Sequence, residues 1–162
     1  SEEKMSKDGV KVELTNGVAV VTLVNPPFNF LNLDILRAYR RVLENLDDDP
    51  NCRAIVLASD GEVFCAGADF KTVTNDIQEG LEPSVMLSEF YTQVRALYYI
   101  SKPMVAAVAG PAIGAGLGLA VLADFRISCP EATFSANFNR LGFHPGFGLS
   151  ATLPRLIGTY NA

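Results

Sequence analysis

The chain has few of the residues that build metal centres and disulfide frameworks. Its 162 residues include one histidine and three cysteines. The cysteines, Cys52, Cys65 and Cys129, are odd in number and lack metal-ligand spacing. The sequence therefore predicts a reduced, intracellular protein with no metal site.

Unbroken apolar runs and an excess of positive charge are missing as well. Glycines and a proline interrupt the longest apolar stretch, Met104 to Ala123, so we expect no membrane span. Thirteen Lys and Arg against 18 Asp and Glu give a net charge of −5, which argues against a nucleic-acid-binding surface. The polar start, Ser1 to Lys4, lacks the apolar segment of a signal peptide. We expect a cytoplasmic protein, with an organelle matrix as the alternative.

What the chain does have is the composition of one globular domain. Hydrophobic residues make up 49% and charged residues 19% of a length that suits a single sizeable core. We expect a disordered leader over residues 1–8 and one core domain over residues 9–162.

Strands alternate with helices along this domain. Asn16-Gly17 predicts a hairpin between two apolar strands, and Asn32 is a suitable N-cap for an amphipathic helix over Leu33 to Leu46, with Arg37, Arg40 and Arg41 on its outer face. Further elements are expected at Ala54 to Leu57, Met86 to Ile100, Met104 to Ala109, Phe125 to Ser128 and Leu149 to Leu156. This alternation favours an α/β fold with a mainly parallel sheet covered by helices.

The stretch from Pro103 to Ile127 combines a buried strand, a glycine turn, a buried helix and a second strand. Glycines at such a junction let the backbone approach a bound group closely. A helix that starts there directs unpaired N–H groups and the positive end of its dipole toward that group. We therefore expect the ligand atom to be an oxygen that carries or develops negative charge.

Two similar loops each follow a buried strand and precede a helix. They are Cys65 to Asp69 and Gly114 to Gly116. If their strands are neighbours, the N–H groups of Ala68 and Ala115 converge on one carbonyl oxygen and form an oxyanion hole. Ordinary tight strand-to-helix turns would explain the same spacing.

Six segments, in order, are similar to the crotonase superfamily, the enoyl-CoA hydratase/isomerase family. They are Asn25-Pro26-Pro27 with Asn32, Gly61 to Asp69, Lys102 to Asp124, Leu141-Gly142, Pro145-Gly146 and Leu153 to Gly158. The resemblance implies a spiral of ββα units, an acyl-CoA thioester substrate and a trimer or dimer of trimers. It implies that the oxyanion donors are the N–H groups of Ala68 and Ala115. It also implies that the backbone from Ala66 to Phe70 borders the bound coenzyme A, which enters as part of the substrate and not as a separate cofactor.

The chain departs from this family at three carboxylate positions. By position, Gly118, Phe138 and Gly146 stand where family members carry acidic residues. Hydration of an enoyl-CoA needs acid and base groups near the α and β carbons, and neither glycine nor phenylalanine can titrate. The sequence therefore predicts lyase- or isomerase-type enolate chemistry with non-standard proton-transfer groups, rather than standard hydration.

Three other side chains are candidates for the missing groups. His144 is the only histidine, and its pKa suits proton transfer; packing of the loop beside Pro145 is the alternative. Tyr91 matches a helix position where the dehalogenase branch carries histidine, although a half-buried packing role fits too. Arg140 pairs with an acidic substrate group or lies on the surface. The expected substrate-binding set is Ala66, Gly67, Phe70, Gly114, Phe138 and Arg140.

The family continues with C-terminal helices that this sequence lacks, so the C-terminal part of the fold is expected to be absent.

Three other readings of the function stay open. A dinucleotide-binding domain would need glycine where Leu119 stands. A homologue that binds acyl-CoA without catalysis, or a C–C bond hydrolase of the same superfamily, would fit the missing carboxylates.

Overall fold

The structure is a computed structural model that describes residues 3–5, 9–69 and 82–162. Its centre is a six-stranded sheet in the order β1-β2-β3-β4-β5-β7. The strands are β1 (Glu3–Met5), β2 (Val10–Thr15), β3 (Val18–Leu23), β4 (Ala54–Ser59), β5 (Met104–Val108) and β7 (Phe125–Ser128). The pairs from β3 to β7 are parallel and the first two pairs are antiparallel. The predicted α/β class with a mostly parallel sheet is confirmed.

The antiparallel end of the sheet is a hairpin extended by the N-terminal segment. Asn16 and Gly17 join β2 to β3 with positive φ angles of 53° and 81°, as the Asn-Gly signal predicts. The expectation of a disordered leader over residues 1–8 is wrong for Glu3–Met5, which pairs with β2. The free edge of a hairpin offers unpaired N–H and C=O groups to any extended segment, and side-chain patterning alone does not reveal this.

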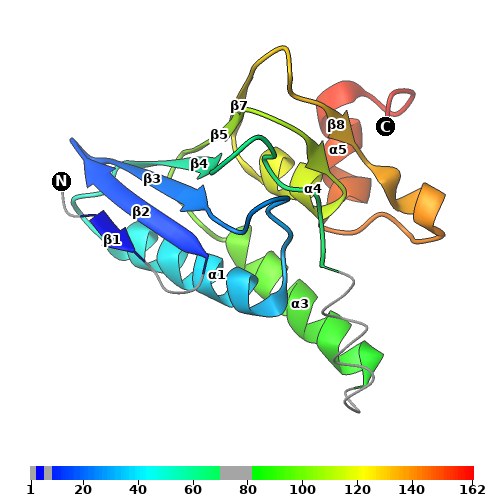
Figure 1. Cartoon of the computed structure of the whole chain (residues 1–162), viewed down its shortest axis with the longest axis horizontal. Helices are drawn as coiled ribbons and strands as arrows, with labels where there is room; N and C mark the ends of the chain where they lie inside the picture. The colour runs from blue at the N-terminus through cyan, green and yellow to red at the C-terminus, as the bar shows by residue number, and fades with distance from the viewer. Residues whose placement is uncertain (1–2, 6–8, 70–81) are drawn as a thin grey trace.

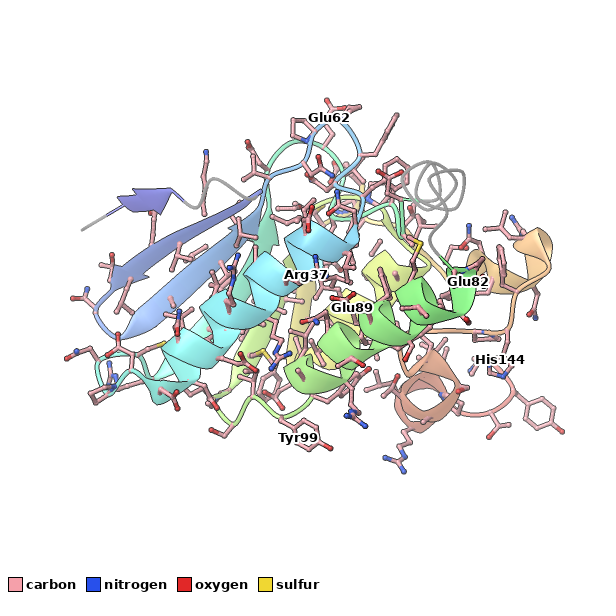
Figure 2. All side chains as sticks on the ribbon, turned by 90° about the horizontal axis from the view of Figure 1, so that it is seen from below. Arg37, Glu62, Glu82, Glu89, Tyr99 and His144 are labelled. Carbon is pink, nitrogen blue, oxygen red and sulfur yellow. The ribbon has the colours of Figure 1, made fainter. Side chains whose placement is uncertain are left out.

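Two helices, α1 (Leu33–Asp48) and α3 (Pro83–Leu97), lie side by side across one face of the sheet (Figures 1 and 2). The Asn32 side chain accepts a hydrogen bond from the Ile35 amide, as predicted for an N-cap. Pro83 at the first turn starts α3 three residues before the predicted Met86.

The arginines predicted on the outer face of α1 do not all point to solvent. Arg37 forms an ion pair with Glu89 of α3. Arg40 Nη1 lies 3.3 Å from Oε1 of Gln93, which is also in α3. The two helices therefore pack together through a polar strip above their apolar faces.

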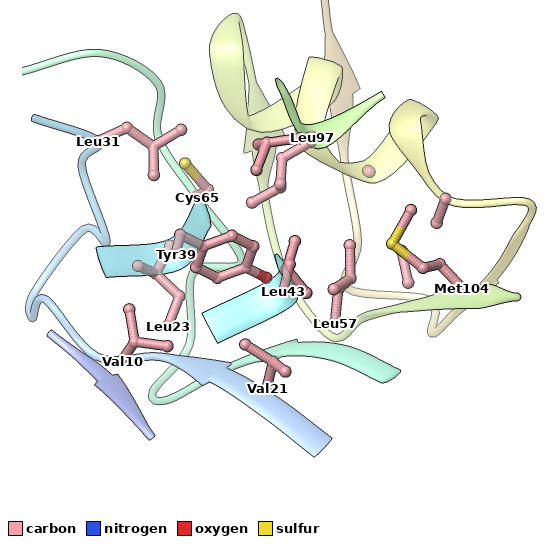
Figure 3. Packing of buried hydrophobic residues seen from close by; sticks show 14 of the residues in the cluster. Val10, Val21, Leu23, Leu31, Tyr39, Leu43, Leu57, Cys65, Leu97 and Met104 are labelled. Carbon is pink, nitrogen blue, oxygen red and sulfur yellow. The ribbon is translucent and has the colours of Figure 1, made fainter. Parts of the chain in front are cut away.

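The core lies between these helices and the sheet (Figure 3). Strand register places Val21, Leu57 and Ala106 in one row of fully covered side chains. Tyr39, Leu43 and Leu97 reach this row from the helices. The apolar alternation seen in the sequence thus marks the face of the sheet that the helices cover.

Beyond β5 the chain turns into the glycine-rich region. It forms a short strand β6 (Ala112–Ile113), helix α4 (Ala115–Leu122), then β7, and a second short strand β8 (Phe134–Ser135) that pairs in parallel with β6. This small second sheet is absent from the sequence-based expectation. The 3₁₀ helix η1 (Asn137–Leu141) and helix α5 (Leu149–Ile157) follow. No helix in the described ranges is both long and apolar enough to cross a membrane.

Tyr39 carries a buried hydroxyl that has no hydrogen-bond partner among the described residues. Burial raises the pKa of this phenol, and nearby Cys65 adds to the shift. An unsatisfied buried polar group costs about 1–3 kcal/mol, so Tyr39→Phe is expected to leave the free energy of unfolding unchanged or to raise it. Urea unfolding measures this, with the exposed Tyr99→Phe as control. A clear loss of stability in Tyr39→Phe alone would show that the hydroxyl has a partner.

Asp47 joins the end of α1 to the entrance of β5. Its Oδ1 accepts hydrogen bonds from the backbone amides of Ser101 and Lys102, each at 3.0 Å. Partial burial acts to raise the pKa of Asp47, but these hydrogen bonds outweigh it and hold the pKa below its ordinary value. The stabilisation is therefore present above the unfolded-state pKa of about 4 and is lost as pH falls through the lower folded-state pKa.

We accordingly expect Asp47→Asn to be less stable at pH 7 and to lose less stability on acidification below about pH 4. Urea unfolding at several pH values checks this, with the exposed neighbour Asp48→Asn as control. Identical acid dependence in wild type and Asp47→Asn would contradict the assignment.

Candidate active site

The first candidate loop is held against the segment that precedes α1. The Leu31 amide donates to the Gly67 carbonyl at 2.8 Å, and the Asp69 amide donates to the Leu31 carbonyl at 2.9 Å. These bonds form a parallel bridge between Leu31 and Ala68. Because neighbouring residues of an extended segment direct their N–H groups to opposite sides, the Ala68 N–H points away from Leu31.

The second loop lies beside the first, as the sequence analysis required. The Cys65 amide donates to the Pro111 carbonyl at 3.1 Å, and the Ile113 amide donates back to the Cys65 carbonyl at 2.9 Å. A parallel bridge between Cys65 and Ala112 results. Main-chain hydrogen bonds therefore join the start of the first loop, at Cys65, to the segment that leads into the second loop.

Glycine is required where the loops meet. A Cβ atom added at Gly116 would lie 2.0 Å from the Cys65 carbonyl oxygen. One added at Gly67 would lie 3.1 Å from the Ile113 carbonyl oxygen and 3.7 Å from the Ala115 nitrogen. The Gly67 backbone thus borders the Ala115 amide, which brings the Ala68 turn next to the start of α4.

Two amides at this junction are the oxyanion donors predicted from the sequence, those of Ala68 and Ala115. Ala115 is the first residue of α4, after Gly114 with a φ of 56°. The first amides of a helix have no partner inside the helix, and they lie at the positive end of its dipole. Neither the Ala68 nor the Ala115 amide donates a hydrogen bond to any residue that the structure describes.

Aromatic side chains occupy the space at two of the three positions without a carboxylate. A Cβ atom added at Gly118 would lie 2.4 Å from the Phe147 Cβ, and one added at Gly146 would lie 2.1 Å from the Tyr91 hydroxyl oxygen. Phe138, at the third position, has its ring 3.9 Å from a Cβ added at Gly114. The side of α4 beyond the two amides is therefore lined by aromatic groups.

Phe147 is the site residue that sequence reasoning missed. It is fully buried, and its φ of 54° is uncommon for a residue with a side chain. The Tyr98 hydroxyl donates to its carbonyl at 2.9 Å, which helps hold this conformation. Only the pairing of a glycine at 118 with a bulky residue elsewhere could have signalled it, and one sequence does not reveal such a pairing.

Two titratable groups at the junction, the Cys65 thiol and the Tyr91 phenol, stay neutral at physiological pH. Burial raises the pKa of the Cys65 thiol to about 12, although a hydrogen bond with the Gly67 backbone opposes the shift. Burial also raises the pKa of Tyr91, against a hydrogen bond from the Phe147 backbone amide. Tyr91 is therefore a hydrogen-bond donor and not a phenolate. Within the described ranges, no group of three or more His, Cys, Asp or Glu residues is arranged to hold a metal ion.

Other residues singled out from the sequence lie outside this junction. His144 is exposed on the loop that leads into α5 (Figure 2), and its Nδ1 lies 2.8 Å from the carbonyl oxygen of neighbouring Pro145. Arg140 is exposed in the last turn of η1. Phe70 falls outside the described residues. Asp124, the last residue of the Lys102 to Asp124 segment, accepts a hydrogen bond from the Met104 amide at 2.8 Å and so has a structural role.

Comparison with known proteins matches nearly the whole chain to one family. The sequence model described as "Enoyl-CoA hydratase/isomerase" covers residues 13–162. A probable enoyl-CoA hydratase of Mycobacterium tuberculosis is 36% identical over 93% of this chain, and one of Bacillus subtilis is 35% identical over 96%. The chain spans about 60% of the length of these relatives, 59% of the first and 60% of the second.

Solved structures agree with the sequence relatives. A putative enoyl-CoA hydratase/isomerase from Mycobacterium abscessus superposes with a TM-score of 0.86 at 33% identity, covering 94% of this chain and 60% of that one. Pseudomonas aeruginosa PA4980 superposes with a TM-score of 0.87 at 34% identity, covering 98% of this chain and 68% of that one.

Gly116→Ala tests the contact that brings the two loops together. Helix propensity alone would make alanine about 1 kcal/mol more favourable than glycine inside α4. Because the added methyl would meet the Cys65 carbonyl at 2.0 Å, we expect the variant to be destabilised by about 3 kcal/mol instead.

Thermal and urea unfolding measure the sign of this effect. Gly61→Ala is the matched control, because its φ is 79° but nothing lies within 4 Å of the added Cβ; it is expected to cost about 1 kcal/mol. If Gly116→Ala were as stable as wild type, the loops would not be in contact.

Proposed function

Because the chain belongs to the enoyl-CoA hydratase/isomerase family, the crotonase superfamily, we propose that it binds an acyl-CoA thioester and stabilises the enolate-like anion formed from it. The Ala68 and Ala115 amides act as the oxyanion hole. The chemistry is of the lyase or isomerase type, and the proton-transfer groups differ from the usual carboxylates.

One observation supports this proposal above the others. Two backbone N–H groups without partners among the described residues lie on adjacent turns, and one of them starts a helix. Paired donors of this kind polarise a thioester carbonyl and stabilise the negative charge that moves onto its oxygen. The N–H groups are fixed by main-chain hydrogen bonds before any ligand arrives, so little reorganisation accompanies the reaction.

The surroundings of the two amides disfavour standard hydration. Gly118 and Gly146 offer no carboxylate, and aromatic groups fill the space beside them. A homologue that binds acyl-CoA without turnover is the second candidate, and the Phe147 ring packed on Gly118 is the observation that favours it. A C–C bond hydrolase of the same superfamily would use the same oxyanion hole with a different attacking group.

The remaining features of the proposal follow from the family. Coenzyme A is part of the substrate, and its chain runs along the backbone from Ala66 to Gly67. His144 remains a candidate for proton transfer only if its exposed loop changes position in the complex. Assembly as a homotrimer or dimer of trimers in the cytoplasm or an organelle matrix completes the proposal.

Ala115→Pro removes one proposed donor at a position where proline is well tolerated. Proline fits the first turn of a helix because the N–H it lacks has no partner inside the helix. We expect Ala115→Pro to keep the fold but to lose about 2.7–4 kcal/mol of transition-state stabilisation. If the wild-type protein shows no turnover, the variant is expected to lose binding of acetoacetyl-CoA instead.

Ala115→Gly serves as the matched control, since it keeps the amide and removes only a methyl group. Calorimetric titration with acetoacetyl-CoA, together with circular dichroism of both variants, separates loss of the donor from loss of the fold. Undiminished binding and turnover in folded Ala115→Pro would remove this amide from the proposed site.

A further inference from the structure

Tyr91 extends from α3 to the loop that precedes α5. A Cβ atom added at Gly146 would lie 2.1 Å from the Tyr91 hydroxyl oxygen and 3.5 Å from the Phe138 ring. The hydroxyl therefore rests directly against the Gly146 backbone, which is buried. Only glycine at 146 leaves room for it.

The hydrogen bonding of this hydroxyl is incomplete. The Phe147 backbone lies beside its oxygen and opposes the rise in the pKa of Tyr91 that burial causes. The Tyr91 O–H proton has no acceptor among the residues that the structure describes. Tyr39 is buried in the core, whereas Tyr91 as a whole residue is 39% exposed. A tyrosine O–H beside apolar groups favours a hydrogen-bond partner.

Two tyrosines lie against the Gly146-Phe147 segment: Tyr91 of α3 and Tyr98, the residue that follows α3. Tyr98 donates to the Phe147 carbonyl at 2.9 Å, and the Tyr91 hydroxyl lies against the preceding Gly146. The Phe147 side chain in turn packs against Gly118 of α4. The position of the Tyr91 hydroxyl is thus coupled by direct contacts to the helix whose first amide is the proposed donor.

Phe138 connects the same hydroxyl to the start of α4 by a second route. Its ring lies within 3.9 Å of Cβ positions added at both Gly114 and Gly146. Gly114 immediately precedes the Ala115 amide. One aromatic ring therefore separates the proposed oxyanion donor from the free O–H of Tyr91, and an acyl chain extending from the thioester would pass along that ring.

We propose that the Tyr91 hydroxyl is a specificity-determining group that donates a hydrogen bond to an oxygen on the acyl chain, so that the site prefers acyl-CoA thioesters carrying a β-oxygen substituent over unsubstituted ones. This rests on the proposed acyl-CoA function. A site built around a polar contact discriminates against a ligand without the matching group, because its own donor is then left unpaired.

A pair of ligands that differ by one hydroxyl group tests this most sharply. Calorimetric titration compares 3-hydroxybutyryl-CoA, as each enantiomer, with butyryl-CoA. Wild type is expected to bind one enantiomer about tenfold more tightly than butyryl-CoA. In Tyr91→Phe the ratio is expected to fall to about one.

Two further variants separate this role from packing. Tyr99→Phe removes a phenol hydroxyl from a residue that is 76% exposed just beyond α3 (Figure 2), and it is expected to keep the tenfold preference. Gly146→Ala places a methyl where the Tyr91 hydroxyl lies, so it displaces the hydroxyl without deleting it and is expected to lose the preference. Thermal unfolding shows which variants are folded.

The outcomes separate the role of Tyr91 from the proposed acyl-CoA function. If wild type binds neither thioester, both the proposed function and the role of Tyr91 are overturned. If wild type binds both thioesters equally, or if folded Tyr91→Phe keeps the preference, the role of Tyr91 is wrong while acyl-CoA binding stands.

Discussion

The candidate site depends on a single contact between two stretches of main chain. The segment around Cys65 and the segment around Ala112 pair as in a parallel sheet, and Gly116 then passes within contact of the Cys65 carbonyl. Every later feature of the site relies on this approach. A side chain at position 116 would hold the turns apart, and the Ala68 and Ala115 amides could not form the proposed oxyanion hole.

In the proposed function, the backbone supplies the part of the chemistry that needs fixed geometry. Backbone amides held by hydrogen bonds on both sides cannot rotate away, whereas side-chain donors can. The side chains around them are then free to vary, which explains how one scaffold supports different reactions. In this chain that variation takes the form of aromatic groups: Phe147 against Gly118, and Tyr91 against Gly146.

Local chemistry in the sequence was enough to predict the hairpin at Asn16-Gly17, the cap at Asn32 and the glycine turn before α4. Each of these depends on residues that are close together in the chain. The pairing of β1 and the small β6–β8 sheet were not predictable, because short main-chain pairings leave no side-chain pattern.

The site likewise combines features that the sequence could indicate with features that it could not. The convergence of the two glycine turns was expected on the condition that their strands are neighbours, and β4 and β5 are parallel neighbours. The Phe147 conformation and its packing on Gly118 could not be predicted, because the two residues lie 29 positions apart and the φ of 54° depends on Tyr98. His144 was a candidate because of its chemistry, and the structure places it on an exposed loop beside the neighbouring Pro145.

A crystal structure of the protein with butyryl-CoA would test the central claim most directly. The account predicts that the thioester oxygen lies about 2.7–3.1 Å from the amide nitrogens of both Ala68 and Ala115. A thioester bound elsewhere, or an oxygen within reach of neither amide, would contradict it.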